Sequence, residues 1–212
     1  MSVFDLLQEA GQPFDCVVQA GAHVGQEVEP FRTRGVKRAI MIEPNAGPYS
    51  QLCAAIGEGT DFTPVQAVCS SLDGEPCDFY VASFDQASST MKPKRHLKAY
   101  PKISFEEPVR MTTRTLDSIV AEVERSRPDF SSRTIDLLYI DTQGAELKVL
   151  MGATRALQFA KSIWSEVSYD LYEGGATLEQ QQAFLSAFGF KLHYIRLKPK
   201  GWGDALFVKS RS

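Results

Sequence analysis

Residues 15–27 read Asp15-Cys16-Val17-Val18-Gln19-Ala20-Gly21-Ala22-His23-Val24-Gly25-Gln26-Glu27, a pattern typical of a strand, a glycine turn and the start of a helix. It opens with a short apolar run, residues 16–18, of the kind found in buried β-strands. Gly21 and Gly25 then predict a tight turn, because glycine tolerates positive φ and lets a ligand approach the backbone. Val24, Val28 and Phe31 follow at helical spacing and predict the start of a helix with free N–H groups beside the turn.

A second strand is predicted at residues 39–42, and Glu43 follows directly. In nucleotide-binding βαβ units, an acidic residue at about this distance after the glycine turn binds the ribose hydroxyls. The two elements together predict a pocket for a nucleoside cofactor.

The composition is that of an ordinary globular protein. A length of 212 residues fits one domain, residues 1–212, and 43% of the residues are hydrophobic. The net charge of -3 gives no basic footprint for nucleic acid, and no apolar run reaches the length of a membrane span. The N-terminal stretch carries Asp5 and Glu9 and lacks the basic region of a secretory signal. The four cysteines show no metal-ligand spacing, so we expect reduced thiols in a cytoplasmic protein.

Strands and helices alternate along most of the chain. Further strands are predicted at 62–68, 135–140 and 162–167, and residues 190–197 and 205–208 look like a closing antiparallel pair. This alternation predicts an α/β fold with a mainly parallel sheet covered by helices on both faces. Ligands of such sheets bind beyond the carboxyl ends of the strands. We therefore expect Gly21, Glu43, Asp141 and Glu166 to share that edge.

The alternation is interrupted after the third strand. Strands are predicted at 77–82 and 109–113, and the polar residues 83–107 between them form an insertion that is too long for a simple hairpin loop. Its segment 88–98 combines serines with basic residues. We interpret the insertion as a lid over an anionic or polar acceptor, with a solvated surface loop as the alternative.

A series of short motifs resembles the FkbM-type methyltransferases, a family of S-adenosylmethionine-dependent enzymes with a Rossmann-like fold. The matching motifs run in family order over residues 15–208: Gln19-Ala-Gly-Ala-His-Val-Gly-Gln26, Ile42-Glu-Pro-Asn45, Ala67-Val-Cys-Ser70, Thr115-Leu-Asp-Ser118, Ile135-Asp-Leu-Leu-Tyr-Ile-Asp-Thr-Gln-Gly-Ala-Glu-Leu147, Glu166-Val-Ser168 and Gly203-Asp-Ala-Leu-Phe207. The resemblance implies a class I methyltransferase fold, with a seven-stranded, mostly parallel sheet whose last strand is antiparallel.

The resemblance also implies a cofactor site for S-adenosyl-L-methionine. The glycine turn would surround the methionine portion, Glu43 would hold the ribose, and Asp141 would face the transferable methyl group. The residues expected at this site are Gln19, Gly21, His23, Gly25, Gln26, Glu43, Asn45, Gln66, Ala67, Ser88, Ser89 and Asp141. The chain departs from the family at Gln19, where an acidic residue is usual, and at His23, where asparagine is common.

Three residues are candidates for the chemistry. A hydroxyl acceptor must lose its proton, and Asp141, Glu166 and His96 carry groups that remove protons. Asp141 has the alternative role of capping the following helix, and His96 that of a surface histidine. Glu146 is expected to be a capping partner at that helix start. A divalent cation between Asp141 and Glu166 is the weaker interpretation, so we predict no metal.

The aromatic residues Tyr169, Tyr172 and Trp202, together with His193, either line a sugar-binding mouth or belong to the core. We expect a cytoplasmic O-methyltransferase that acts on a hydroxyl of a sugar, glycan or secondary metabolite, without nucleic acid or membrane partners and with a homodimer left open. One alternative is a nicotinamide-dependent oxidoreductase, although the GxGxxG pattern is incomplete. The other is a binding module of the same fold without catalysis, suggested by Gln19.

Overall fold

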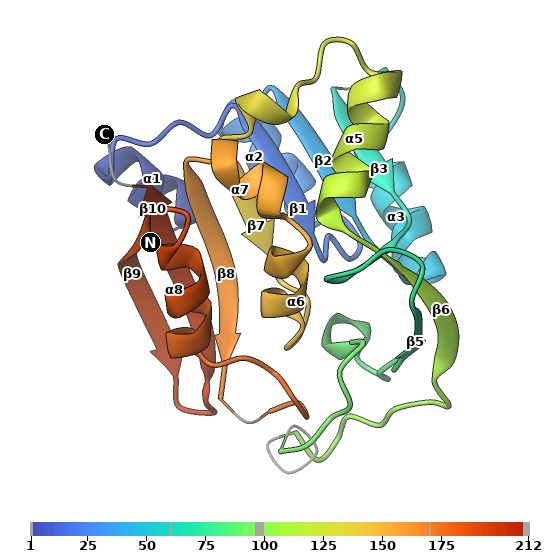
Figure 1. Cartoon of the computed structure of the whole chain (residues 1–212). Helices are drawn as coiled ribbons and strands as arrows, with labels where there is room; N and C mark the ends of the chain where they lie inside the picture. Colours follow the sequence, from blue (N-terminus) through green and yellow to red (C-terminus); the bar gives the residue numbers. More distant parts are fainter. Residues whose placement is uncertain (1, 60, 96–99, 170, 210–212) are drawn as a thin grey trace.

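A seven-stranded sheet forms the centre of the protein, which we describe from a computed structural model covering residues 2–59, 61–95, 100–169 and 171–209 (Figure 1). Its strands are β1 (Cys16–Ala20), β2 (Arg38–Ile42), β3 (Phe62–Val65), β7 (Leu137–Ile140), β8 (Ser162–Ser168), β9 (Phe190–Lys198) and β10 (Trp202–Lys209). They follow the order β3-β2-β1-β7-β8-β10-β9. Strand β10 is antiparallel to both of its neighbours, and the other pairs are parallel. The predicted mostly parallel sheet with an antiparallel last strand is confirmed.

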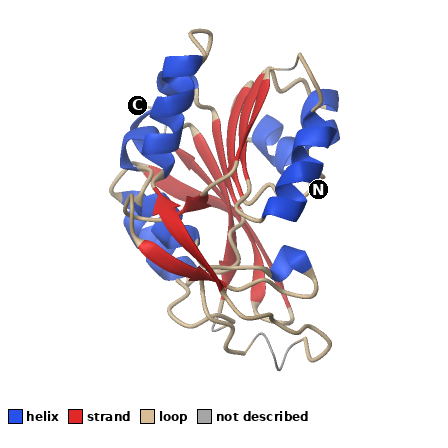
Figure 2. Ribbon diagram, turned by 90° about the vertical axis from the view of Figure 1, so that its right-hand side faces the viewer, coloured by secondary structure: helices blue, strands red, loops and turns tan. Residues whose placement is uncertain are grey.

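Helices cover both faces of this sheet, as the view in Figure 2 shows. On one face lie α1 (Val3–Glu9), α2 (Val28–Thr33) and α3 (Ala46–Ile56), and on the other α5 (Leu116–Ser126), α6 (Glu146–Met151), α7 (Thr154–Phe159) and α8 (Leu178–Ser186). Strand β1 contributes side chains to the hydrophobic cores on both faces of the sheet. Val17 packs in the core on the α1 side, and Val18 packs in the core on the α5 side. Burial on both faces explains why its sequence is continuously apolar.

The second, smaller sheet lies where the alternation breaks. It contains β4 (Val68–Cys69), β6 (Val109–Arg114) and β5 (Pro76–Phe79) in that order. The strand predicted at 62–68 is therefore divided, because β3 ends at Val65, the last residue paired with β2, and residues 68–69 pair with β6 instead. The strand predicted at 77–82 occupies residues 76–79, and Tyr80 and Ala82 make only isolated bridges.

The helical segment after Gly144 consists of two helices, α6 and α7, which meet at Gly152 and Ala153. A side chain at Gly152 would lie 2.1 Å from the carbonyl oxygen of Ser70, so the backbone contacts the β4 end directly. Gly152, a poor helix former, stands at the break between the two helices.

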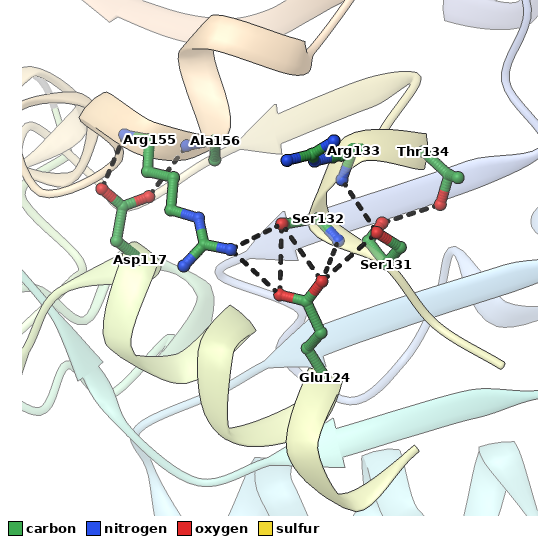
Figure 3. Close-up of polar contacts among 8 residues, drawn as sticks. All are labelled: Asp117, Glu124, Ser131, Ser132, Arg133, Thr134, Arg155 and Ala156. Atoms are coloured by element: carbon green, nitrogen blue, oxygen red, sulfur yellow. Dashed lines mark hydrogen bonds and ion pairs between the residues drawn. The ribbon is translucent and has the colours of Figure 1, made fainter. Parts of the chain in front are cut away.

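A polar cluster ties α5 to α7 and to the segment that leads into β7 (Figure 3). Helix α7 has no cap of its own, because its N-cap residue is Ala153. Asp117 of α5 replaces that cap by accepting hydrogen bonds from the backbone N–H groups of Arg155 (2.7 Å) and Ala156 (2.9 Å). Glu124 of α5 accepts from the Ser132 backbone at the start of the short 3-10 helix η2 (Ser132–Thr134). The cluster thus fixes the base of the strand that ends at Asp141.

The described parts of the insertion, residues 83–95 and 100–107, lie beyond the carboxyl ends of the central strands, at the bottom of Figure 1. It includes the 3-10 helix η1 (Asp85–Ala87) and runs beside the segment after β8. Lys94 N–H donates to the Leu171 carbonyl (2.9 Å), and Glu173 N–H donates to the Lys92 carbonyl (2.8 Å). Throughout the ranges that the structure describes, no helix has both the length and the apolar character needed to cross a lipid bilayer.

Candidate active site

A cavity of about 290 Å³ opens at the carboxyl ends of β1, β2, β7 and β8, and the insertion covers its outer side. The cavity brings together most of the residues predicted from the sequence. Those on its wall are Gly21, His23, Gln26, Glu43, Ala67, Ser88, Ser89, Asp141 and Glu166. The lining is completed by apolar residues of β4 and β5 and by side chains of the insertion.

The turn at Gly21 joins three strand ends. Gly21 has a φ of +87°, and both Gly21 N–H and Ala22 N–H donate to the carbonyl oxygen of Ile42 at 2.9 Å. A side chain at Gly21 would lie 1.7 Å from the carbonyl oxygen of Asp141. Glycine is therefore required for packing β1 against β7 as well as for its backbone angle. The helix predicted from Val24 begins only at Val28, because residues 23–27 form turns, so the expected helix start beside Gly21 is wrong.

Glu43 has a fixed orientation at the end of β2. Its side chain is only 6% exposed, and its carboxylate accepts hydrogen bonds from His23 N–H (2.9 Å) and Asn45 N–H (2.8 Å). Each carboxylate oxygen thus meets a backbone donor, which holds the group against the cavity wall. These bonds also tie the Gly21 turn to the loop after β2.

Gln19 points away from the cavity. It is 1% exposed, and its amide nitrogen donates to Glu27 Oε2 at 3.2 Å. Burial raises the pKa of Glu27 to about 7, the Gln19 bond opposes this rise, and the negative charge of Asp141 adds to it. The residue that departs from the family's acidic pattern is therefore paired with a neighbouring acid.

Three other predicted cofactor residues also lie off the cavity wall. Gly25 packs inside the protein, where a side chain would lie 3.0 Å from Leu52. Asn45 is the N-cap residue of α3, and the side-chain amide of Gln66 donates to the Pro44 carbonyl at 3.3 Å. Their sequence motifs lie next to the strand ends, as predicted, but these three residues belong to the loops around the cavity and not to its wall.

Asp141 and Glu166, which we call the carboxyl pair, lie on the wall at the ends of β7 and β8. The side-chain amide nitrogen of Gln143 bridges them, donating to Asp141 Oδ1 at 2.7 Å and to Glu166 Oε2 at 2.5 Å. Burial, followed by the neighbouring charge of Asp141, raises the pKa of Glu166 well above its usual range. Glu166 thus keeps its proton to a higher pH than an accessible glutamate does.

Capping of α6 falls to Glu146. Its Oε1 accepts from Gly144 N–H (2.9 Å) and Thr142 N–H (3.0 Å), which confirms the expected capping role. Helix α6 has Ala145 as its N-cap residue, so the alternative role of Asp141 as that cap is wrong. Burial raises the pKa of Glu146 to about 7. Asp141 is left facing the cavity.

Trp202 and Tyr100 form the rim beside Glu166, and they come from the start of β10 and from the insertion. The indole N–H of Trp202 donates to the Tyr100 hydroxyl at 2.7 Å. The ammonium group of Lys198 lies 3.3 Å from the centre of the Trp202 ring, and that of Lys200 lies 4.0 Å from the centre of the Tyr100 ring. Sequence analysis missed Tyr100, which has no recognisable motif around it.

The remaining candidates for the mouth are placed differently. Tyr172 is 2% exposed and belongs to a small core with Met91, and Tyr169 and His193 do not line the cavity. His96 lies outside the described residues. Within the parts of the chain that the structure covers, no group of three or more His, Cys, Asp or Glu side chains is arranged to hold a metal ion.

The strand order, the glycine turn and the acidic residue after β2 define a Rossmann-like, S-adenosylmethionine-dependent methyltransferase. The chain belongs to the methyltransferase FkbM domain family, whose model matches residues 19–192. It is 33% identical over 194 residues to the 2-O-methyltransferase NoeI of Sinorhizobium fredii, and this match covers 87% of the chain and 76% of that protein.

Solved structures share the fold. TrmK from M. capricolum, solved with S-adenosyl-homocysteine, is 9% identical with a TM-score of 0.52, and the match covers 99% of this chain and 69% of that one. A Rossmann-superfamily protein from Streptococcus agalactiae is 13% identical with a TM-score of 0.51, covering 100% of this chain and 70% of that one. At these identities the likeness describes the fold alone.

The cavity suits the methyl donor that the family uses, S-adenosyl-L-methionine. Its volume of about 290 Å³ is close to the roughly 300 Å³ at which small-molecule sites begin. Ala67, Val68 and Phe79 give it an apolar end, and the fixed Glu43 carboxylate supplies acceptors for a diol. The family assignment replaces the oxidoreductase alternative.

Proposed function

We propose that the protein transfers the methyl group of S-adenosylmethionine to a hydroxyl group of a sugar, a glycan or a secondary metabolite. The observation that carries this proposal is that Asp141 lines the same cavity as Gly21 and Glu43. The similarity to a protein named as a 2-O-methyltransferase supports oxygen as the atom that accepts the methyl group.

The cofactor site in this proposal follows the cavity wall. Gly21, His23 and Gln26 contact the methionine portion, Glu43 binds the ribose hydroxyls, and Ala67 lies against the adenine. Ser88 and Ser89 contact the cofactor from the insertion. Gln19, Gly25, Asn45 and Gln66 then act indirectly, by shaping the loops that carry these groups.

Catalysis then depends on the alignment of the acceptor oxygen with the methyl group of the cofactor and on the removal of the hydroxyl proton. When bound, S-adenosylmethionine supplies an electrophilic methyl group on its sulfonium. Asp141 accepts the proton of the acceptor hydroxyl, and protonated Glu166 donates a hydrogen bond that keeps the acceptor oxygen in line. The insertion excludes water from the cavity and acts as the acceptor lid. A role for His96 as the base remains a second, weaker proposal.

For the cellular setting, we propose a cytoplasmic enzyme whose acceptor is not nucleic acid. The free cysteines Cys16, Cys53, Cys69 and Cys77 and the net charge of -3 support this proposal. We also propose a single catalytic domain over residues 1–212. The homodimer stays a prediction that light scattering at several concentrations will test.

The test is methyl transfer from radiolabelled S-adenosylmethionine to a library of neutral, acidic and amino sugars, followed by mass spectrometry and methylation analysis. We expect an O-methyl product from the wild type and none from Asp141→Asn. A product methylated on nitrogen or carbon, or on tRNA supplied in the same screen, would contradict the proposal.

A further inference from the structure

Gln143 connects the members of the carboxyl pair, and its amide has a defined orientation. The nitrogen donates to Asp141 and Glu166, while the oxygen Oε1 accepts a hydrogen bond from the Tyr172 hydroxyl at 3.1 Å. A carboxamide carries two N–H donors on one side and an acceptor on the other. The Tyr172 donor therefore keeps both N–H groups directed at the two carboxyl groups.

The backbone of Gln143 is fixed by the insertion. Its carbonyl oxygen accepts from Ser89 Oγ at 2.7 Å, and Gln143 adopts a φ of +54°, which is unusual for a residue with a side chain. The next residue, Gly144, packs so closely on the Tyr172 ring that a side chain there would lie 2.8 Å from it. Tyr172 in turn bridges to Pro93 of the insertion. Neither the main chain nor the amide is thus free to turn.

We propose that Gln143 is a positioning residue for methyl transfer: its amide holds Asp141 and Glu166 at one spacing, and the insertion sets that amide through Tyr172 and Ser89. This inference rests on the proposed function, because it assigns the pair its role in removing the hydroxyl proton. It goes beyond that function in two respects. It names the amide that holds the two carboxyl groups together, and it names the segment that orients this amide.

The electrostatic consequence can be measured directly. A hydrogen bond donated to a carboxylate stabilises its ionised form, so the Gln143 amide lowers the pH at which Glu166 loses its proton. Burial and like charges act in the opposite direction at Glu166. The titratable or charged groups around Glu166 are Asp141 at the end of β7, Glu146 of α6, Tyr172, and Asp204 of β10 with its partner Arg196.

The experiment is a carbon-13 NMR titration of the Asp and Glu carboxyl carbons in the protein bound to S-adenosylhomocysteine. Gln143→Met keeps the length of the side chain but removes both donors. We expect it to move the titration step of Glu166 upward by about one to two pH units, the value of one lost hydrogen bond to a charged group. Tyr172→Phe removes the bond that orients the amide and should give a smaller shift of the same sign.

Ser165→Ala is the matched control. Ser165 makes buried hydrogen bonds to Gln181 (2.8 Å) and to the backbone carbonyl of Glu166 (3.1 Å), but it does not touch the carboxyl group. The control should leave the titration unchanged. An equal shift in Ser165→Ala, or an unchanged titration in Gln143→Met, overturns the inference. If Gln143→Met does not fold, an unchanged titration in Tyr172→Phe overturns it instead.

The titration needs no methyl acceptor. The positioning role of Gln143 can therefore be tested separately from the proposed O-methyltransferase activity. An enzyme that methylates hydroxyl groups but shows no shift in Gln143→Met refutes the inference alone. A shift in a protein that methylates no hydroxyl group refutes the proposed function. Once an acceptor is known, the acid limb of the kcat–pH profile should move with the NMR steps.

Discussion

Glu43 is the residue that we propose binds the ribose of the cofactor. Its carboxylate accepts two backbone hydrogen bonds and faces the cavity from the end of β2. We predict that Glu43→Ala weakens the binding of S-adenosylhomocysteine by about 10- to 100-fold, because a charge-assisted contact to the ribose and the fixed turn are both lost. Isothermal titration calorimetry measures the change. Asp78→Asn, on an exposed acid that pairs with Arg110, is the control and should bind like the wild type.

Substitution of Asp141 should lower the turnover of methyl transfer without weakening the binding of the cofactor. Asp141→Asn keeps the shape of the side chain and its neighbour Gln143 but cannot accept a proton from the acceptor. We predict S-adenosylhomocysteine affinity within about 3-fold of wild type and a loss of at least about 100-fold in turnover, the usual size of a lost general base. Calorimetry and a methyl-transfer assay give the two values. Wild-type turnover in this variant would remove Asp141 from the mechanism.

At the residue scale, the sequence predicted where groups lie along the strands better than where their side chains point. Glu43 and Asp141 follow directly after buried strands, so their place at the edge could be predicted. Gln19 belongs to a matching motif, yet its side chain turns inward to Glu27, a partner that only the folded structure identifies. Gln143 was missed because its role depends on Tyr172, 29 positions away in the sequence.

At the element scale, α7 depends on a cap that another helix provides. Asp117 of α5 accepts hydrogen bonds from two backbone N–H groups in the first turn of α7 (Figure 3). We predict that Asp117→Ala lowers the free energy of unfolding by about 1 to 2 kcal/mol, the cost of losing an N-cap. Urea denaturation followed by circular dichroism measures this change.

The control for Asp117→Ala is Glu122→Ala. Glu122 also lies on α5, and its exposed carboxylate forms an ion pair with Arg114. It should change the free energy of unfolding by less than about 1 kcal/mol, as is usual for a surface ion pair. Equal losses in the two variants would show that Asp117 contributes only as a surface charge.

The helices and strands could be predicted where a regular pattern fixes them. Thr115 caps α5, and a threonine directly before an amphipathic run is a local signal that a sequence carries. The break between α6 and α7 was not predicted from the apolar spacing, which continues past it, although Gly152, a poor helix former, stands at that position. The division after Val65 was not predicted either, because it depends on the pairing of β4 with β6.

At the scale of the whole molecule, buried acids couple folding to pH. Burial raises the pKa of Glu27 to about 7, above the value of 4.5 for an accessible glutamate. The folded state therefore binds more protons than the unfolded state between these values, and the stability contributed by Glu27 is present at low pH and lost as pH rises toward 7.

Glu27→Gln should remove this part of the pH dependence. We predict that the decrease in unfolding free energy between about pH 5 and pH 7.5 is about 1 to 3 kcal/mol smaller in the variant than in the wild type. Urea denaturation at both pH values provides the comparison. Parallel pH profiles for the two proteins would show that Glu27 titrates normally in the folded state.

The global topology was the most predictable feature, because alternating strands and helices allow few arrangements, and the closing antiparallel pair matched β9 and β10. The path of the insertion was not predictable. Its contacts with residues 171–173 and with Trp202 are formed by backbone groups and single side chains without periodicity.

We propose that the methyl donor lies between the Gly21 turn and Glu43, with its sulfur directed at Asp141. A crystal structure of the protein with S-adenosylhomocysteine tests it most directly. We predict ribose hydroxyls within hydrogen-bond distance of the Glu43 carboxylate and the sulfur on the Asp141 side of the cavity. A nucleoside bound elsewhere, with the Gly21–Glu43 wall unoccupied, would contradict the account.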